Sequence, residues 1–326
     1  MQADASREQS LPRIFTLHSG RQFSYVFNCG GETRYSQDPS VYAVRSTALT
    51  TTLATYIAGI NPSPALIEFG TGMVYKPPSS SNISSGGCSE TAALKPWLKI
   101  AKAKLQAEEA LEKLAREKSL KYVCLRLAHV YGEYDVGFLA RGLCLARVYQ
   151  GLGRELKWLW TKDLRINTVH VLDVCNAAWK AAVWCAANPP TSQSTMADRA
   201  FNIVDMGDTK QETLSIIVSK IFNIETGFQG SIVSQFAKLN LDNVVDDVNE
   251  DILQPWADML KTKGLDAGQG SPLTPFMEKE LLKDHSLCLD GKKARDTLAW
   301  VAARDRLTEE RVKEILESYE RMKWWP

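Results

Sequence analysis

The chain has 326 residues, of which 44% are hydrophobic, so it is long and apolar enough to bury a core in one large or two modest domains. Its 39 basic and 38 acidic residues give a formal net charge of +1. A chain this close to neutral has no global field that would attract nucleic acid or an anionic membrane surface. We therefore expect neither as a partner.

Cysteine and histidine usage argues against disulfides and metal sites. The seven Cys are scattered and never form a Cys-x-x-Cys motif, and the four His include no pair at helical ligand spacing. The start of the chain lacks the apolar core of a signal peptide, and the longest apolar stretch, 169–187, is interrupted by Asp173 and Lys180. These features predict free thiols, no metal, no membrane span and a cytoplasmic location.

Short apolar runs alternate with longer segments of helical character along the first half of the chain. This alternation is typical of a doubly wound parallel sheet with helices on both faces. The predicted elements are strands at 24–29, 65–70, 121–127 and 200–204, and helices at 39–57, 97–118, 138–150, 173–187 and 308–325.

The amino-acid composition changes after about residue 188, where Pro189 and Pro190 precede a Ser- and Thr-rich stretch at 191–195. Such composition marks a linker. We expect an α/β fold in two regions. Residues 1–188 would form a Rossmann-like core, and residues 189–326 would form a mixed, mostly helical substrate or lid region.

Several segments, in the same order, resemble the extended short-chain dehydrogenase/reductase superfamily, the group of NAD-dependent epimerases/dehydratases and 3β-hydroxysteroid dehydrogenases. The resemblance spans most of the chain. Its segments are VFNCGGETRY at 26–35, FGTGMVY at 69–75, WLKIAKAKLQAEE at 97–109, LRLAHVYGEYD at 125–135, VHVLDVCNAAWKA at 169–181 and CLDGKKARDTLAW at 288–300.

The resemblance implies an NAD(P) cofactor, a small organic molecule as substrate, and a homodimer formed through the helices at 39–57 and 97–117. It also implies roles for particular residues. The implied catalytic residues are Thr71 and Lys104; the implied cofactor-binding residues are Cys29, Gly30, Gly31, Lys104, Ala128, His129 and Val130; the implied substrate-binding residues are Glu32, Tyr75, Tyr131 and Arg165. For each of these residues, ordinary packing or solvation is the alternative interpretation.

The proton donor of the family is missing from this sequence. In the family a Tyr precedes the Lys by four positions and exchanges a proton with a carbonyl, while the ammonium lowers the pKa of the phenol. Here Ile100 stands four positions before Lys104, and no Tyr lies between Tyr75 and Tyr122. Another phenol could substitute as the acid, and the candidates are Tyr75, Tyr131 and Tyr134.

The Gly-rich turn of dinucleotide-binding folds is also missing. No Gly-x-Gly-x-x-Gly or Gly-x-x-Gly-x-x-Gly occurs between a strand and a helix, although that turn lets backbone amides approach the cofactor's diphosphate. The sheet would therefore be incomplete, with residues 25–29 as an apolar edge strand. The edge would be covered by the N-terminal residues or by another chain, or the sequence is a truncated gene product, which we favour.

The sequence is compatible with two functions. One is an NAD(P)-dependent oxidoreductase or epimerase/dehydratase-like enzyme, in which Ile100 makes the standard reaction doubtful. The other is a non-catalytic protein of the same fold, a pseudoenzyme that binds a small molecule or has a regulatory role. Near Arg165, Trp158 and Trp160 could form an aromatic wall of a substrate pocket.

Overall fold

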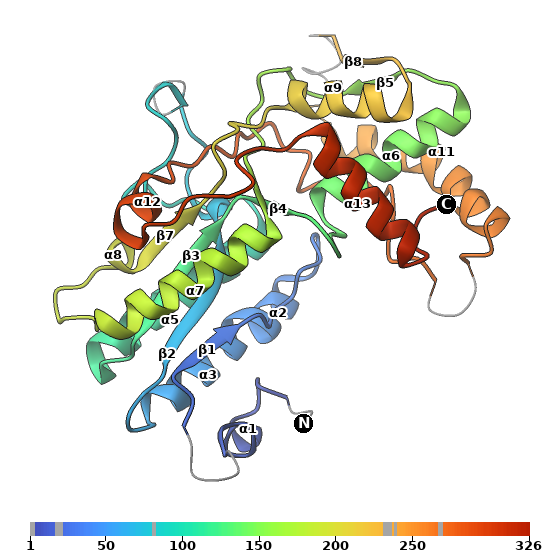
Figure 1. Cartoon of the computed structure of the whole chain (residues 1–326). Helices are drawn as coiled ribbons and strands as arrows, with labels where there is room; N and C mark the ends of the chain where they lie inside the picture. Colours follow the sequence, from blue (N-terminus) through green and yellow to red (C-terminus); the bar gives the residue numbers. More distant parts are fainter. Residues whose placement is uncertain (1–3, 17–21, 80–82, 231–236, 238–239, 267–269) are drawn as a thin grey trace. The chain divides into compact units, whose positions relative to one another are not determined.

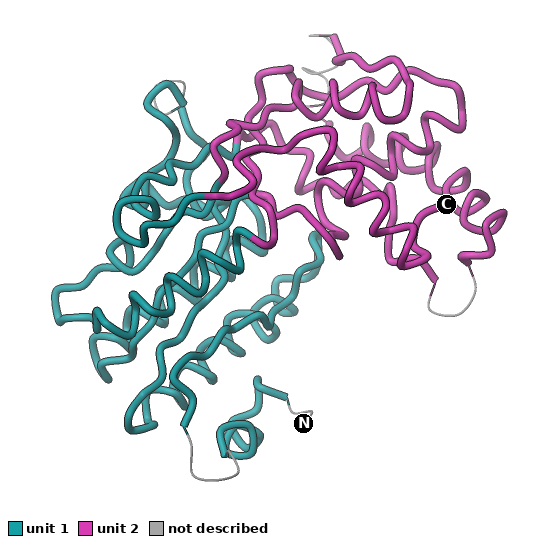
Figure 2. Tube along the Cα trace, viewed as in Figure 1, with its two compact units in different colours: residues 1–128, 173–204, 287–301 teal, residues 129–172, 205–286, 302–326 magenta. Residues whose placement is uncertain are grey.

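The computed structural model describes residues 4–16, 22–79, 83–230, 237, 240–266 and 270–326. Its Cα packing divides the chain into two compact units (Figure 2). Unit 1 comprises residues 1–128, 173–204 and 287–301, and unit 2 comprises residues 129–172, 205–286 and 302–326. This division differs from the single boundary that the sequence predicts near residue 188, because the chain returns to each unit several times.

Among the described residues, unit 1 is built on a four-stranded parallel sheet of order β1-β2-β3-β7, with β1 at one edge. The predicted parallel sheet is thus confirmed. The strand at 200–204, which the sequence places beyond the linker in the second region, instead completes this sheet beside β3. Its strands are β1 (Tyr25–Asn28), β2 (Ala65–Thr71), β3 (Tyr122–Leu127) and β7 (Ala200–Ile203).

Helices cover both faces of this sheet (Figure 1). Side chains alternate between the faces of a strand, and Leu66 of β2 packs on the side of α3 and α5. On the other face, Tyr25 and Phe201 make ring contacts with α7. The helices of unit 1 are η1 (Glu8–Ser10), α1 (Leu11–Phe15), α2 (Pro39–Tyr42), the π-helix η2 (Ala43–Ala48), α3 (Leu49–Ala58), η3 (Gly72–Val74), α5 (Lys99–Lys118), α7 (Val171–Ala187, from Asp173 in this unit), α8 (Met196–Arg199) and α12 (Lys292–Leu298).

Unit 2 is mostly helical, and its apolar core includes Leu143, Val218 and Tyr319. Two short parallel strand pairs, β4-β6 and β5-β8, accompany the helices. The elements are α6 (Phe138–Leu152), α9 (Gln211–Phe222), α11 (Leu241–Thr262) and α13 (Glu309–Arg321), with β4 (His129–Tyr131), β5 (Leu156–Trp158), β6 (Thr168–His170) and β8 (Thr226–Phe228).

The helix at the C-terminus shows how local sequence sets an element boundary. The Thr308 side chain accepts a hydrogen bond from the Arg311 backbone N–H, so it caps the first turn of α13. Glu309 and Glu310 lie in that first turn, where the helix dipole favours negative charge. Within the described ranges, no helix has both the length and the apolar character needed to cross a bilayer.

Candidate functional site

A buried ion pair lies beside the end of β1. Lys104 Nζ of α5 is 3.2 Å from Glu68 Oε1 of β2, and the two side chains are 13% and 1% exposed. Asn28, the last residue of β1, donates from Nδ2 to Glu68 Oε2 at 2.5 Å. Burial raises the pKa of Glu68, and the Lys104 ammonium opposes that rise because a nearby cation favours the carboxylate. Glu68 therefore holds Lys104 against the sheet.

The loop after β1 passes close to this ion pair. Gly31 has φ +140°, a conformation that L side chains rarely adopt. A Cβ at this position would lie 3.4 Å from Ser46 Oγ and 3.7 Å from Lys104 Nζ. Gly30 N–H donates to Asn28 Oδ1 at 3.2 Å, which holds the turn in place. The glycine thus keeps the space next to the Lys104 ammonium free of a side chain.

The next residues of the loop use their polar groups internally. The Glu32 carboxylate pairs with Arg34 at 2.8 Å and with Arg45 at 3.0 Å. Hydrogen bonds from Arg34, supported by Arg45, lower the pKa of Glu32 to about 2. Cys29 is exposed, and its backbone N–H donates to the Phe27 carbonyl. The predicted contact of Glu32 with substrate would have to compete with two guanidinium groups.

Thr71 ends β2 and caps the short helix η3. Its Oγ1 accepts a hydrogen bond from Met73 N–H at 3.2 Å. A hydroxyl that accepts one bond still has a hydrogen to donate. The Thr71 hydroxyl can therefore serve both the local backbone and a second oxygen atom.

Tyr75 lies in the interior of unit 1, where it is 2% exposed. Its hydroxyl donates to Asn202 Oδ1 and accepts from Arg126 Nη1, both at 2.8 Å. Burial raises the pKa of the phenol. These bonds occupy the hydroxyl, so a role of Tyr75 as substitute acid would require this network to open.

Arg126 joins two of the segments that carry the family resemblance. It is fully buried, and its Nε and Nη2 donate to Glu108 Oε2 at 3.0 and 2.8 Å. Glu108 Oε1 has no hydrogen-bond partner among the described residues. A buried charge pair of this kind connects α5 to β3, which gives both segments a structural role.

The remaining predicted cofactor residues follow β3. Ala128 is buried in unit 1, and its N–H donates to the Ile203 carbonyl at 3.1 Å. His129 and Val130 belong to β4 in unit 2. The His129 ring stacks on Phe138 with centroids 4.3 Å apart, and burial lowers the pKa of His129 to about 4. The imidazole is therefore neutral near pH 7.

The predicted substrate residues of unit 2 also have internal partners. The Tyr131 hydroxyl donates to the Arg306 carbonyl at 3.2 Å. Arg165 Nε lies 3.2 Å from Asp208 Oδ2, and its side chain is 19% exposed. Tyr134 is 66% exposed and has a left-handed backbone conformation.

The position of the missing phenol lies in the first turn of α5, where Ile100 is partly exposed. In the described part of the chain, the hydrogen-bond partner of the Lys104 ammonium is Glu68, and no tyrosyl hydroxyl bonds to it. The described residues also bring no three His, Cys, Asp or Glu side chains together as a possible metal site. Near the ends of β1 and β2, the structure thus offers the Lys104 ammonium, the Thr71 hydroxyl and the Gly30–Gly31 turn.

Sequence reasoning did not find Glu68, the partner of Lys104. The signal was present, because 65–70 reads ALIEFG, and a carboxylate in an otherwise apolar buried strand needs a partner. Sequence reasoning also did not find Asn28. The signal was of the same kind, because its amide is the only polar side chain in β1 besides the Tyr25 hydroxyl.

Comparison with known proteins agrees with this architecture. A model of the NAD dependent epimerase/dehydratase family matches residues 2–203. No curated protein sequence matches the chain significantly.

Solved structures of low sequence identity share the fold. UDP-glucose 4-epimerase of Thermotoga maritima, determined with UDP-glucose, has a TM-score of 0.64 and 19% identity, covering 98% of this chain and 84% of that one. Pal from Bacillus thuringiensis has a TM-score of 0.66 and 14% identity, covering 99% and 83%. RMD from Pseudomonas aeruginosa, complexed with NADPH, has a TM-score of 0.63 and 15% identity, covering 99% and 87%.

Proposed function

Because the chain belongs to the NAD-dependent epimerase/dehydratase family, we propose that it is an NAD(P)-dependent oxidoreductase or epimerase/dehydratase-like protein that acts on a small organic molecule. What supports this assignment is the Gly30–Gly31 turn beside Lys104, where a Cβ at Gly31 would approach the ammonium. A small-residue turn next to a fixed cation fits the nicotinamide ribose of the cofactor. The sequence offers no Gly-rich turn to which the diphosphate can be assigned.

The chain's own groups have distinct tasks in this proposal. The bound cofactor would supply or accept a hydride. Lys104 would bind the ribose hydroxyls, and Glu68 would keep its ammonium in place through their ion pair. The Thr71 hydroxyl, which already accepts from Met73 N–H, would donate its hydrogen to a substrate oxygen. Ala128, His129 and Val130 stay predictions as cofactor contacts, and Glu32, Tyr75, Tyr131 and Arg165 stay predictions as substrate contacts.

The cofactor site is tested by titrating the protein with NADPH and NADH and following the fluorescence of the reduced nicotinamide. We expect a Kd tighter than about 10 µM, or roughly 7 kcal/mol of binding free energy, for one of them. Gly31→Val should weaken binding because its side chain enters the space beside Lys104. Gly86→Val is the matched control, since Gly86 also has a positive φ but has nothing within 4 Å of a Cβ. Equal affinities for the two variants would reject the Gly31 site.

The second candidate function is non-catalytic binding or regulation by the same fold. Ile100 in the place of the proton donor favours it, as does the internal use of the Tyr75 hydroxyl. Replacing Ile100 by Tyr separates the two candidates. NADPH oxidation in the presence of carbonyl substrates by the wild type favours the enzyme, whereas activity that appears only in Ile100→Tyr indicates a binding protein that kept the rest of the site.

We also propose a homodimer through the surface of α3 and α5. These helices pack side by side in unit 1, and Val44 of η2, the element before α3, is 60% exposed. An exposed apolar side chain on such a surface is compatible with pairing. Sedimentation of a species of twice the 36.3 kDa chain mass, reduced to the monomer by Val44→Glu, would support the dimer.

A further inference from the structure

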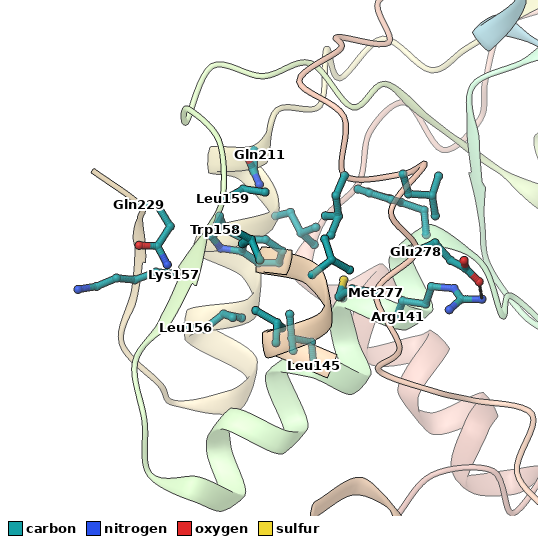
Figure 3. A pocket seen from close by; sticks show the side chains of 18 residues that line it. Arg141, Leu145, Leu156, Lys157, Trp158, Leu159, Gln211, Gln229, Met277 and Glu278 are labelled. Carbon is teal, nitrogen blue, oxygen red and sulfur yellow. Dashed lines mark ion pairs between the residues drawn. The ribbon is translucent and has the colours of Figure 1, made fainter. Parts of the chain in front are cut away.

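Unit 2 contains a cavity of about 130 Å³, and Trp158 is one of the residues that line it. Its lining residues come from α6, β5, α9 and α11, from the segment at 277–282, and from Leu159 and Gln229, and all of them belong to unit 2 (Figure 3). Most are apolar, including Leu145, Leu214, Val245 and Met277. An apolar cavity of about 150 Å³ in another protein stays dry and binds benzene, so this space suits a molecule of about one ring.

Some residues that line this cavity have a buried polar atom without a hydrogen-bond partner in the described part of the chain. Trp158 Nε1, Gln211 Oε1 and Arg141 Nε are buried, and none has a hydrogen-bond partner within the described ranges. All three side chains line the cavity (Figure 3). Native interiors rarely leave such groups unsatisfied, so each one calls for a ligand or an ordered water. Together they offer N–H donors and one amide oxygen acceptor.

The charged side chains that line the cavity form ion pairs or hydrogen bonds with neighbouring residues. Arg141 Nη2 lies 3.6 Å from Glu278 Oε1, and Arg141 Nη1 donates to the Phe276 carbonyl at 2.6 Å. Lys157 Nζ lies 3.1 Å from Glu155 Oε2. A diphosphate would need cations that are not already paired, because desolvating its charges is costly. The lining favours an uncharged occupant.

We propose that this cavity is a binding site for an uncharged, mainly apolar molecule or group of about one ring that carries a hydroxyl. The hydroxyl oxygen accepts from Trp158 Nε1–H, and its hydrogen is donated to Gln211 Oε1, while the ring fills the apolar space. The proposed site lies in unit 2, and ligand binding to it is measured without NADPH. Failure of the NADPH titration would therefore not contradict this proposal.

Gly142 of α6 provides a direct way to close the cavity. A Cβ at this position would lie 3.8 Å from Leu214 Cδ2 and 3.9 Å from Trp158 Cη2, which is ordinary van der Waals contact. Gly142→Ala should therefore be accommodated, whereas the longer side chain of Gly142→Leu must extend between two lining residues. The two variants form a matched pair that differ in how far they fill the space.

The test is calorimetric titration of the whole protein with p-cresol, toluene and uridine monophosphate. We expect p-cresol to bind more tightly than the nucleotide, Gly142→Leu to weaken p-cresol binding at least about tenfold, and Gly142→Ala to change it less than about threefold. If Gly142→Leu fails to fold, Trp158→Phe replaces it. That variant removes the indole N–H and should reduce the preference for p-cresol over toluene, because the hydroxyl keeps only its bond to Gln211 Oε1. Tighter binding of the nucleotide, or a p-cresol affinity unchanged by a folded Gly142→Leu or by Trp158→Phe, would overturn the proposal.

Discussion

Removing the Lys104 ammonium should make the stability of the protein depend steeply on pH. In Lys104→Met, the Glu68 carboxyl stays 1% exposed but loses its cation, so burial raises its pKa further than in the wild type. The folded variant then keeps a proton on Glu68 that the unfolded chain releases, since an exposed Glu ionises near pH 4.3. Because the folded state binds the extra proton, the free energy of unfolding falls as pH rises.

The size of this effect follows from proton linkage. One extra proton in the folded state lowers the free energy of unfolding by at most about 1.4 kcal/mol per pH unit, or about 2.7 kcal/mol between about pH 5.5 and about pH 7.5. The wild type should show a smaller loss over the same interval, because Lys104 favours the charged carboxylate. Urea denaturation followed by tryptophan fluorescence at several pH values measures both slopes.

Two controls isolate the carboxyl. The double variant Lys104→Met with Glu68→Gln has no group to protonate and should lose the steep slope. Lys102→Met removes an exposed charge from the same helix and should leave the pH dependence of the wild type unchanged. If Lys104→Met is no steeper than the double variant, Glu68 is not the partner that the ammonium keeps ionised, and the reasoning fails.

Three further variants test other parts of the structure. Arg126→Met should lower the free energy of unfolding by about 3–5 kcal/mol, because it leaves the Glu108 carboxylate buried without a cation; a loss below about 1 kcal/mol in urea titration would contradict the pairing. Thr308→Ala should cost about 1 kcal/mol through the lost cap, and an unchanged Tm would count against the bond to Arg311. Ile100→Tyr should raise NADPH-dependent turnover about 10²- to 10⁴-fold if only the proton donor is missing; no gain in rate would show that more is lost.

The sheet could be predicted from sequence because its strands are short apolar runs closed by turn residues. The runs at 24–29, 65–70 and 121–127 correspond to β1, β2 and β3. The strand at 200–204 was predicted as a strand beyond the linker, and it pairs with β3 in unit 1. The prolines before this strand mark a linker in the sequence. Pairing with β3 is a contact between residues far apart in sequence, so local composition does not predict it.

The sequence predicted those parts of the site that lie within a single segment, but not the contacts between segments. Lys104 and the Gly30–Gly31 turn follow from segments that resemble the family, whereas the ion pair with Glu68 joins α5 to β2 across 36 positions. In the cavity of unit 2, Trp158 was suspected as part of an aromatic wall. Gln211 was not suspected, because a single glutamine at a helix start looks like any surface residue until its burial is known.

The claim on which the proposed function depends is that the Lys104 ammonium, held by Glu68 beside the Gly31 turn, binds the cofactor. The most direct measurement is NADPH titration of the wild type, Lys104→Met and Lys102→Met under identical conditions. We predict that Lys104→Met weakens binding at least about tenfold, or about 1.4 kcal/mol, while Lys102→Met matches the wild type. A wild type that does not bind NADPH, or a Lys104→Met variant that binds it equally well, would contradict the account.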